Sequence, residues 1–384
     1  MVTRSGRSAT GYEDRDRRSS KDADQVAPAS VVIPVLGPCP LLSRTVHFYQ
    51  SQDLIAEVII ADGSSRGRGS LELGVLNCPK LRYMRIPKLV NESLNQHFAR
   101  RIAMATRAVR TEYVVVSGGD DFFLPSFVRR AIRLLGENDG LSVVLGTKLH
   151  WRNLGAIGRE AALHPKLPAP LPYTDAPTMT ASERLQAPLA PPWRCWSVGR
   201  RREVSEYWSQ IAPVLPRGRH LGEFLLHASA RIALPTEVIK YPMILRYWSH
   251  LHVPMLFSAR AIERAVASTE LDIFLRVVTR DHSSTVSAEL EATLRQRAVK
   301  FISQDASGTR TRLWRRESKE LAAAVWYGLP LGLWKLNDQL HLTSMSSSSR
   351  AERVTKLFAL YSKAERAELH RDFREVESYL GSFG

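Results

Sequence analysis

The sequence predicts an α/β protein with a doubly wound, mostly parallel sheet that carries helices on both faces, followed by a helical C-terminal region. Short runs rich in Val and Ile alternate with stretches of helical spacing over about the first two thirds of the 384 residues. Several of these runs end directly in Asp, Gly or Ser, as strands do where they stop at one edge of a sheet. Beyond about residue 257 strand signals become scarce, and apolar and charged residues recur at helical spacing.

The elements of the alternation follow one another in chain order. They are strand 31–35, helix 39–50, strand 57–61, strand 81–86, helix 91–109, strand 114–116, helix 126–135, strand 141–145 and strand 239–245, with helices 259–279, 287–302 and 351–380 behind them. A strand, helix, strand order predicts parallel neighbours. In such sheets, ligands bind in the crevice outside the carboxyl ends of the strands. Functional side chains are therefore expected directly after these strands.

Carboxylates occupy two of these strand ends. Asp62 follows strand 57–61, and Asp120 with Asp121 follows strand 114–116 after two glycines. Adjacent carboxylates suit a hard divalent cation such as Mg²⁺ or Mn²⁺, which shares its remaining ligand positions with substrate phosphates and water. The alternative is that the pair forms a turn and caps the helix that begins near Pro125.

The motifs at these strand ends resemble those of the inverting family 2 glycosyltransferases, which have the GT-A fold. Residues 31–35, Ala61-Asp62-Gly63-Ser64 and Gly119-Asp120-Asp121 carry the resemblance, which extends over residues 29–252. There is no Gly-x-Gly-x-x-Gly after the first strand and no Gly-Lys-Ser/Thr loop, which disfavours a dinucleotide or P-loop site. The resemblance implies a nucleotide-diphospho-sugar donor, a glycan or glycolipid acceptor and Mn²⁺ or Mg²⁺ as cofactor.

The resemblance also implies roles for particular residues. Asp62 would recognise the base, and Pro34, Gly119 and Asp120 would complete the nucleotide-binding set. Asp120 and Asp121 would hold the metal that bridges the diphosphate. A bound cation stabilises the charge that develops on the departing nucleoside diphosphate without a proton transfer.

A general base and two further groups are implied later in the chain. Glu223, in the segment 221–226, occupies the place of the family's Gly-Glu-Asp and would accept the proton of the attacking hydroxyl. The alternative is a solvent-facing Glu that stabilises the first turn of a helix. Arg246 would bind phosphate oxygens, and His250 would reach the metal, although a histidine near a strand end is more often structural.

The sequence departs from the family pattern at two places. Gly118 or Gly119 stands where relatives carry the first acid of the metal cluster, and Phe224 stands where a second acid is common after the Glu. A catalytically inactive GT-A-fold interaction module therefore stays open as an alternative to an active transferase.

Composition divides the chain into three parts. Residues 1–27 are dense in Arg, Ser, Asp and Lys and predict a disordered tail, residues 28–256 the GT-A-like domain, and residues 257–384 the helical region. The N-terminal segment has no apolar stretch of the signal-peptide type, and the three cysteines form no Cys-x-x-Cys pair. A cytoplasmic protein is expected.

A Pro-rich, irregular segment over residues 164–193 interrupts the domain. Long loops beside such a crevice commonly shape an acceptor pocket. Trp193, Trp196 and Tyr207 come at or after its end, and their rings suit stacking on a sugar or, alternatively, packing in the core.

The basic charge, +16 with a pI near 10.1, suits an anionic partner. Nucleic acid is the less favoured one, because the Arg residues are spread along the chain and no nucleic-acid-binding motif stands out. The uncharged run 321–334 is too short to cross a membrane. With five basic residues before it, it suits an interfacial position on an anionic inner leaflet or, alternatively, a buried helix pair.

Overall fold

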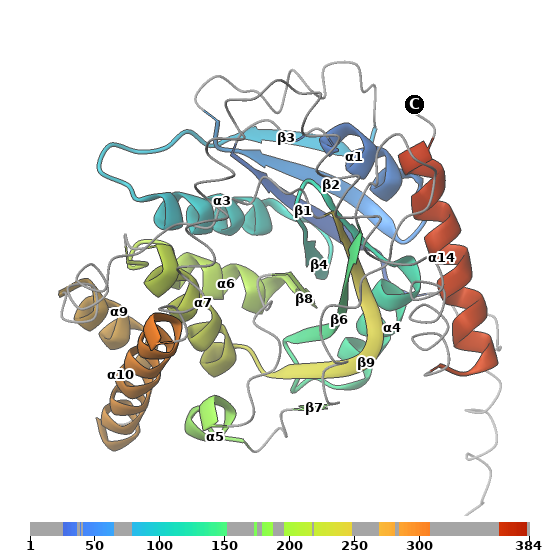
Figure 1. The fold of residues 1–384 in the computed structure, drawn as a ribbon. Helices are drawn as coiled ribbons and strands as arrows, with labels where there is room; N and C mark the ends of the chain where they lie inside the picture. Colours follow the sequence, from blue (N-terminus) through green and yellow to red (C-terminus); the bar gives the residue numbers. More distant parts are fainter. Residues whose placement is uncertain are drawn as a thin grey trace, which may run out of the picture.

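The computed structural model describes residues 26–36, 39, 41–64, 79–151, 173–174, 179–186, 196–216, 219–247, 269–280, 284–307 and 361–381. One sheet lies between two groups of helices (Figure 1). The predicted α/β class, with helices on both faces of the sheet and further helices toward the C-terminus, is confirmed. No helix in this part of the chain is long and apolar enough to span a membrane.

Within the described residues, the sheet has nine strands. In chain order they are β1 (Ala29–Val35), β2 (Ile55–Asp62), β3 (Leu81–Arg85), β4 (Tyr113–Val116), β5 (Asp121–Phe123), β6 (Val143–Trp151), β7 (Tyr173–Thr174), β8 (Val198–Arg200) and β9 (Thr236–Tyr247). Their order across the sheet is β3-β2-β1-β4-β8-β6-β9-β5, and β7 pairs with β9.

The two halves of the sheet differ in strand direction. Strands β3, β2, β1 and β4 are all parallel, as predicted. Beyond β4 the sheet is mixed, because β8 runs antiparallel to both β4 and β6, and β5 and β7 run antiparallel to β9. The prediction of a mostly parallel sheet is therefore correct for the first half only. Strand direction depends on the connections, which the residues of a strand do not encode.

Helices cover both faces. They are α1 (Leu42–Ser51), α3 (Leu94–Ala108), α4 (Pro125–Glu137), α5 (Ala181–Gln186), α6 (Arg201–Ile211), α7 (Arg219–Ala233), α9 (Thr269–Thr279), α10 (Ser284–Ser307) and α14 (Lys363–Gly381). One hydrophobic core contains side chains of α1, α4 and α14, and the other contains side chains of α3, α6, α7, α9 and α10. Val31 and Ile33 face the first core and Val32 the second, so β1 is buried on both faces, which explains its unbroken apolar sequence.

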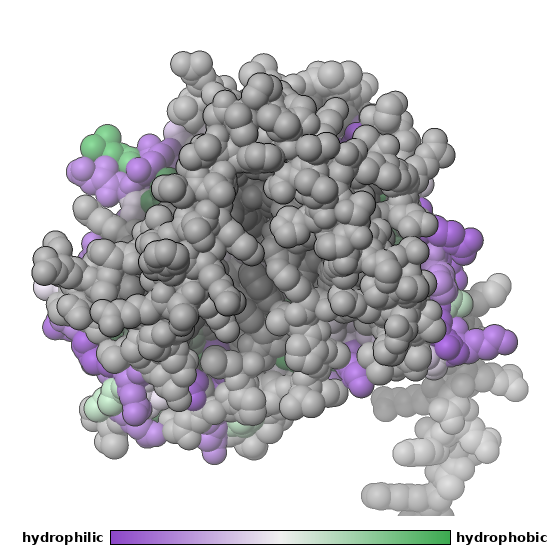
Figure 2. Space-filling view, viewed as in Figure 1, coloured by the Kyte–Doolittle hydropathy of each residue, from purple (hydrophilic) through white to green (hydrophobic). Residues whose placement is uncertain are grey.

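The helix α3 begins three residues later than predicted. Ser93 is its N-cap, and the Ser93 hydroxyl accepts from the Gln96 N–H while the Gln96 side chain accepts from the Ser93 N–H. Before it, Asn91 has a positive φ of 67° in the turn that connects β3 to α3. This connection projects from the molecule (Figure 1), and Figure 2 shows apolar atoms at its tip.

The segment predicted to be irregular contains regular structure where it is described. Strand β7 and helix α5 both lie within residues 164–193. The apolar and charged residues there are too few to give a readable period, since β7 has two residues and α5 has six. Apart from residues 179–180, the remainder of this segment lies outside the described residues, as do residues 1–25 of the predicted tail 1–27 and the uncharged run 321–334 with the basic residues before it.

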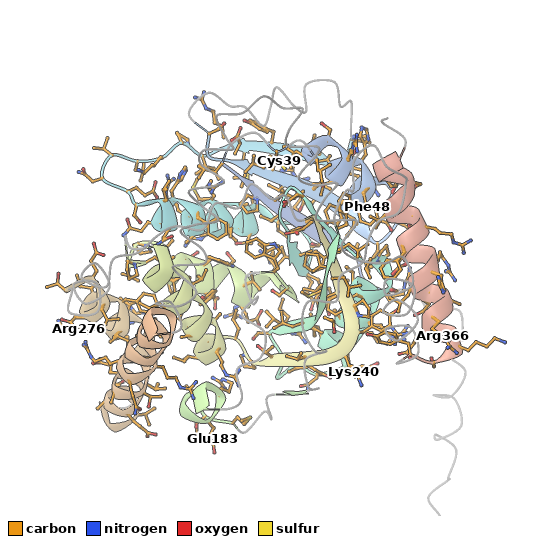
Figure 3. The ribbon with its side chains drawn as sticks, in the orientation of Figure 1. Cys39, Phe48, Glu183, Lys240, Arg276 and Arg366 are labelled. Atoms are coloured by element: carbon orange, nitrogen blue, oxygen red, sulfur yellow. The ribbon has the colours of Figure 1, made fainter. Side chains whose placement is uncertain are left out.

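The C-terminal helices share the cores of the preceding domain. Leu271, Phe274 and Leu290, from α9 and α10, lie in the core with α6 and α7. On the opposite face α14 packs against α1, where the rings of Phe48 and Tyr379 meet edge to face with centroids 5.7 Å apart (Figure 3). The domain boundaries at residues 28 and 257 stay predictions.

A buried acid fixes α14 to the start of α4. Asp372 accepts hydrogen bonds from the Ser126 N–H (3.1 Å) and from the Ser126 hydroxyl, which in turn accepts from the Tyr241 hydroxyl (3.0 Å). Burial raises the pKa of Asp372 to about 6, against the effect of the two Ser126 hydrogen bonds. The negative charge of Glu375 also raises the pKa of Asp372, and the positive charge of Arg129 lowers it.

Replacing this acid tests the pH dependence of α14 docking. Because the folded-state pKa of Asp372 is raised, its contribution to stability is full below about pH 4 and is lost as the pH rises through about 6. We expect Asp372→Asn to raise the free energy of unfolding by about 1–3 kcal/mol near pH 7 and to give no gain near pH 4. Denaturant titrations of both proteins at the two pH values measure this difference. An equal gain at both values would contradict the account.

Candidate functional site

The parallel half of the sheet ends in a row of residues at its carboxyl edge. Val35, Asp62 and Arg85 lie in register at the ends of β1, β2 and β3. The Gly63 N–H donates to the Val35 carbonyl (2.8 Å), which continues the pairing of β1 and β2 by one residue. As predicted from the strand ends, Asp62 therefore lies at the edge where a parallel sheet binds ligands.

The carboxylate of Asp62 is buried and held by two donors. The Ser64 N–H donates to Oδ1 (2.8 Å), and the Tyr83 hydroxyl donates to Oδ2 (2.5 Å). Ser64 is the Ser of the Asp-Gly-Ser motif, and Tyr83 comes from the neighbouring strand β3. Hydrogen bonds to a carboxylate are shorter and stronger than those between neutral groups, so the orientation of Asp62 is fixed before any ligand arrives.

Arg101 on α3 packs over this strand end. Its side chain is 1% exposed, and Nη1 donates to the Val35 carbonyl (2.5 Å). Burial lowers the pKa of Arg101 to about 10, and the charge of Asp62 acts in the opposite direction. A Cβ at position 63 would lie 2.6 Å from both Arg101 Cδ and His97 Cε1, so only glycine fits there. The motif glycine is thus required by the close approach of α3.

His97 is the second buried polar residue of α3 at this place. Its Nε2 lies 2.8 Å from the Ile86 carbonyl, and because a carbonyl only accepts, Nε2 carries the proton. Burial is the largest cause that lowers the pKa of His97, the bond to Ile86 opposes it and the charge of Arg101 adds to it. The imidazole is therefore neutral at pH 7, with Nδ1 as an acceptor.

Two buried nitrogen atoms stand out beside Asp62. Nδ1 of His97 and Nε of Arg101 make no hydrogen bond to any residue that the structure describes. The pair was missed by the sequence analysis, although His97 and Arg101 are four residues apart and so share one face of a helix that follows a parallel strand. That spacing on a helix entering the carboxyl edge is the signal that could have found them.

The second strand end is the link between β4 and β5. Asp121 begins β5 and is buried, and the Trp196 Nε1–H donates to its Oδ2. The Tyr49 hydroxyl donates to the Asp121 carbonyl (3.0 Å) and accepts the Phe123 N–H (3.0 Å). Helix α1, which carries Tyr49, therefore fixes the backbone on which Asp121 stands.

Neither glycine of this link has room for a side chain. A Cβ at Gly118 would lie 2.5 Å from Asp121 Oδ2 and 3.0 Å from Asp120 Oδ1, and one at Gly119 would lie 2.7 Å from Cys39 Sγ. An acid at either position would displace the carboxylates that follow it. In this chain, the oxygens of Asp120 and Asp121 approach the position that a side chain at Gly118 would take.

A row of aromatic and basic side chains joins the two strand ends. The ring of Trp196 stacks on Phe98 of α3, with centroids 6.1 Å apart and an interplanar angle of 20°. The guanidinium carbon of Arg101 lies 5.7 Å from the centroid of the same Phe98 ring, and the charge of Asp62 acts on this guanidinium. Asp121, Trp196, Phe98 and Arg101 therefore form a chain of side-chain contacts that leads from the link between β4 and β5 to the strand end that carries Asp62.

The aromatic residues proposed for sugar stacking have different surroundings. Tyr207 is buried in the second core, and its hydroxyl donates to the Leu226 carbonyl (2.6 Å), so the alternative of core packing is correct for it. Trp196 is partly buried at the candidate site, where its indole holds Asp121. Trp193 lies outside the described residues.

Glu223 lies near the start of α7. The neighbouring Gly222 is in direct contact with the side chain of Asn95, at the start of α3, and Asn95 Nδ2 donates to the Pro216 carbonyl (2.7 Å). The first turns of α3 and α7 therefore adjoin. The description covers the backbone of Glu223 and not its side chain, so its role as general base stays a prediction.

The remaining predicted residues are placed by their backbones. Arg246 on β9 is the Cα partner of Asp121 in the antiparallel pair β5·β9, although its side chain is not described. Pro34 is half-buried and lies in register with Ala61, directly before Asp62. His250 lies outside the described residues.

The carboxylates fit a divalent cation that takes only part of its ligands from the protein. Within the described part of the chain no group of three or more His, Cys, Asp and Glu residues is arranged to enclose a metal. Two adjacent carboxylates are what Mg²⁺ needs when substrate phosphates and water supply the rest. Asp120 is the more accessible of the two, since Asp121 is buried and holds Trp196.

Comparison with known proteins gives similarity of structure only. No family model and no curated protein matches the sequence. Three crystal structures of residues 1–349 of S. aureus TarS align with the chain. That of the fragment alone has 12% identity and a TM-score of 0.45, and covers 93% of this chain and 91% of that one.

The two complexes give similar values. The complex with UDP has 14% identity, a TM-score of 0.45 and coverage of 92% and 88%, and the complex with UDP-GlcNAc has 13% identity, a TM-score of 0.46 and coverage of 93% and 91%. At these identities the likeness concerns the fold alone.

Proposed function

We propose that the chain is a metal-dependent glycosyltransferase that moves a sugar from a nucleotide-diphospho-sugar to a hydroxyl of a glycan or glycolipid, with inversion at the anomeric carbon. The observation that carries the proposal is a chain of side-chain contacts between the carboxylate at the end of β2 and the carboxylate at the start of β5. Asp62 and Asp121, far apart in sequence, are connected through Trp196, Phe98 and Arg101. The order of the motifs along the chain is that of the family 2 enzymes it resembles.

Recognition of the nucleoside rests on Asp62 and its neighbours. A buried carboxylate that is held by Tyr83 and Ser64 presents its oxygens in a fixed direction, which suits an N–H group of a base. Arg101 and His97 add one buried N–H donor and one buried acceptor beside it. A planar, hydrogen-bonding ligand such as a nucleobase matches this mixture of groups, since buried polar atoms are stabilised by partners.

Asp120 and Asp121 would hold the cation, together with the diphosphate of the donor. The cation supplies positive charge at the bond that breaks, where the leaving diphosphate gains negative charge. Arg246 stands beside Asp121 in the strand register and would contact phosphate oxygens, and His250 is proposed to approach the same group. Asp121 also fixes Trp196, so it orders the link as well as contributing charge.

Transfer itself is direct displacement. The acceptor oxygen bonds to the anomeric carbon, the bond from this carbon to the diphosphate oxygen breaks, and the hydroxyl proton passes to a base on the opposite side of the sugar. Glu223 is proposed as that base because α7 begins beside α3, which carries Arg101. A single displacement needs no covalent nucleophile.

One observation favours a second function. Glycine stands where the family has the first acid of its metal cluster, and a side chain at either glycine would require the carboxylates of Asp120 and Asp121 or the thiol of Cys39 to move. A chain that keeps the nucleotide site but lacks turnover would be an interaction module with the same fold. Retained nucleotide binding without release of product identifies this alternative.

A donor panel tests the proposed function. The protein is incubated with UDP-, GDP- and dTDP-sugars in the presence of Mn²⁺ or of a chelator, and the released nucleoside diphosphate is measured. We expect release from donors of one nucleoside class, dependent on the metal. Absence of release from every donor, together with absence of nucleotide binding, would contradict the proposal.

A further inference from the structure

The connection between β3 and α3 exposes apolar side chains at the tip of a protruding loop. In this segment, residues 87–94, which we name the β3–α3 tip, Val90 is 91% exposed, Leu89 57% and Leu94 56%. Figure 2 shows apolar atoms gathered at this projection beside hydrophilic ones. Single exposed apolar residues are ordinary, whereas a group of them on a projecting element marks a contact surface.

The tip is held in this shape by its own hydrogen bonds. Arg100 of α3 donates to both oxygens of Glu92, from Nε (2.6 Å) and from Nη2 (2.9 Å), and also to the Pro87 carbonyl (2.7 Å). The Leu89 N–H donates to Glu92 Oε2 (2.9 Å), and Asn91 supplies the positive φ of the turn. The loop that carries the apolar side chains is therefore held in one conformation by hydrogen bonds, which reduces the conformational entropy that is lost when the loop binds a partner.

The charge along β3, the tip and α3 is almost entirely positive. Residues 79–110 contain eight Lys and Arg and one acidic residue, Glu92, which Arg100 already holds. Arg101 is buried, and Arg82 pairs with Glu57. Arg85 and Lys88 are exposed beside the tip, whereas Arg107 and Arg110 are exposed at the far end of α3.

We propose that the β3–α3 tip binds the surface of an anionic lipid bilayer, with Leu89 and Val90 entering the boundary of the acyl chains and the surrounding cations at the phosphates. Apolar side chains next to Lys and Arg are the combination that such a surface recognises. Nucleic acid would bind the basic side chains, but it offers no apolar region in which the aliphatic side chains of Leu89 and Val90 would be buried. The run 310–334, outside the described residues, is a separate candidate for the same surface.

The position of the tip connects it to the candidate site. The tip follows the carboxyl end of β3, whose last residue Arg85 lies in register with Asp62. Binding at the tip would therefore place the edge that carries Asp62 next to the bilayer. If the proposed function also holds, its acceptor is a hydroxyl of a lipid-linked molecule, and this consequence rests on that function whereas the binding itself does not.

Vesicle binding tests the inference. The full chain is sedimented with vesicles of phosphatidylcholine and with vesicles in which one third of the lipid is phosphatidylglycerol. We expect binding to the anionic vesicles only, weakened by salt. The double variant Leu89→Ser/Val90→Ser and the single variant Lys88→Glu should each lower the partition coefficient by about tenfold.

Two matched substitutions on α9 serve as controls. Ile273→Ser removes an aliphatic side chain that is 51% exposed, and Arg276→Glu reverses an exposed charge far from the tip in sequence (Figure 3). Both should leave the partition coefficient within about twofold of the wild type. Nucleotide binding of all variants is measured alongside, so that a failure of this inference is separated from a failure of the proposed function.

Three outcomes would overturn the inference. They are absence of wild-type binding to anionic vesicles, equal binding by the tip variants and the wild type, and loss of affinity for a nucleic acid by the tip variants with vesicle binding unchanged. The second outcome would assign membrane contact to another segment. The third would assign the tip to nucleic acid.

Discussion

Asp62→Asn is expected to abolish most nucleoside-diphosphate binding. The change keeps the shape of the side chain but removes the charge that acts on buried Arg101, and it weakens the bonds from Ser64 and Tyr83. A hydrogen bond to a charged group contributes about 1.5–3 kcal/mol, so the dissociation constant should rise about 10- to 100-fold. Calorimetric titration of the variant and the wild type measures this ratio.

The same substitution should destabilise the fold for a related reason. Arg101 would remain buried with only the weaker of the two negative charges that act on it, that of Glu92, at a cost of about 2–4 kcal/mol. The double variant Asp62→Asn/Arg101→Met should recover part of this stability, because it removes the uncompensated charge of Arg101. It should recover none of the affinity, because the carboxylate proposed to bind the nucleotide is still absent.

Asp139→Asn is the matched control for Asp62. This carboxylate is 98% exposed and pairs with Arg200 only at the surface, so affinity and stability should both stay close to the wild type. If Asp62→Asn binds nucleotides as well as Asp139→Asn does, Asp62 has no part in the site.

Glu223→Gln is expected to have the largest effect on turnover. A positioned general base contributes about 10²- to 10⁴-fold, so kcat should fall by that factor. The amide keeps the size of the side chain and lies outside the proposed nucleotide contacts, so the dissociation constant of the nucleoside diphosphate should change by about twofold or less. Single-turnover transfer assays and calorimetry on the same preparation separate the two effects.

Glu206→Gln provides the comparison for this experiment. Glu206 is an exposed residue of α6 that pairs with Arg202 one turn away, and its loss should leave kcat unchanged. A Glu223→Gln variant with the turnover of the control would assign Glu223 to the first turn of α7, which is the alternative considered from the sequence.

The sequence was sufficient for β1, β2, β3, β4, β6 and β9, whereas the short strands β5, β7 and β8 were not predicted. Buried parallel strands require unbroken apolar runs, and the residues that stop them lie at one edge, so Asp62 could be placed at the carboxyl edge of the sheet before the structure was known. The glycine at position 63 also followed from the motif, and the structure adds its cause, which is the close packing of His97 and Arg101.

Other features depend on packing between distant segments. Trp196 meets Asp121 and Phe98 only because β8 lies next to β4, and no local pattern encodes that pairing. The same pairing makes the second half of the sheet mixed. The missing acid at Gly118 or Gly119 could be noticed in the sequence, but the absence of space for it there could not.

Calorimetric titration of the wild-type protein with UDP, GDP and dTDP, with and without Mn²⁺, tests the central claim most directly. The account predicts that one nucleoside diphosphate binds, that Mn²⁺ strengthens its binding, and that Asp120→Asn removes the effect of the metal while Asp62→Asn removes the binding. Absence of binding for all three nucleotides in both conditions would contradict the assignment of this sheet edge as a nucleotide-sugar site.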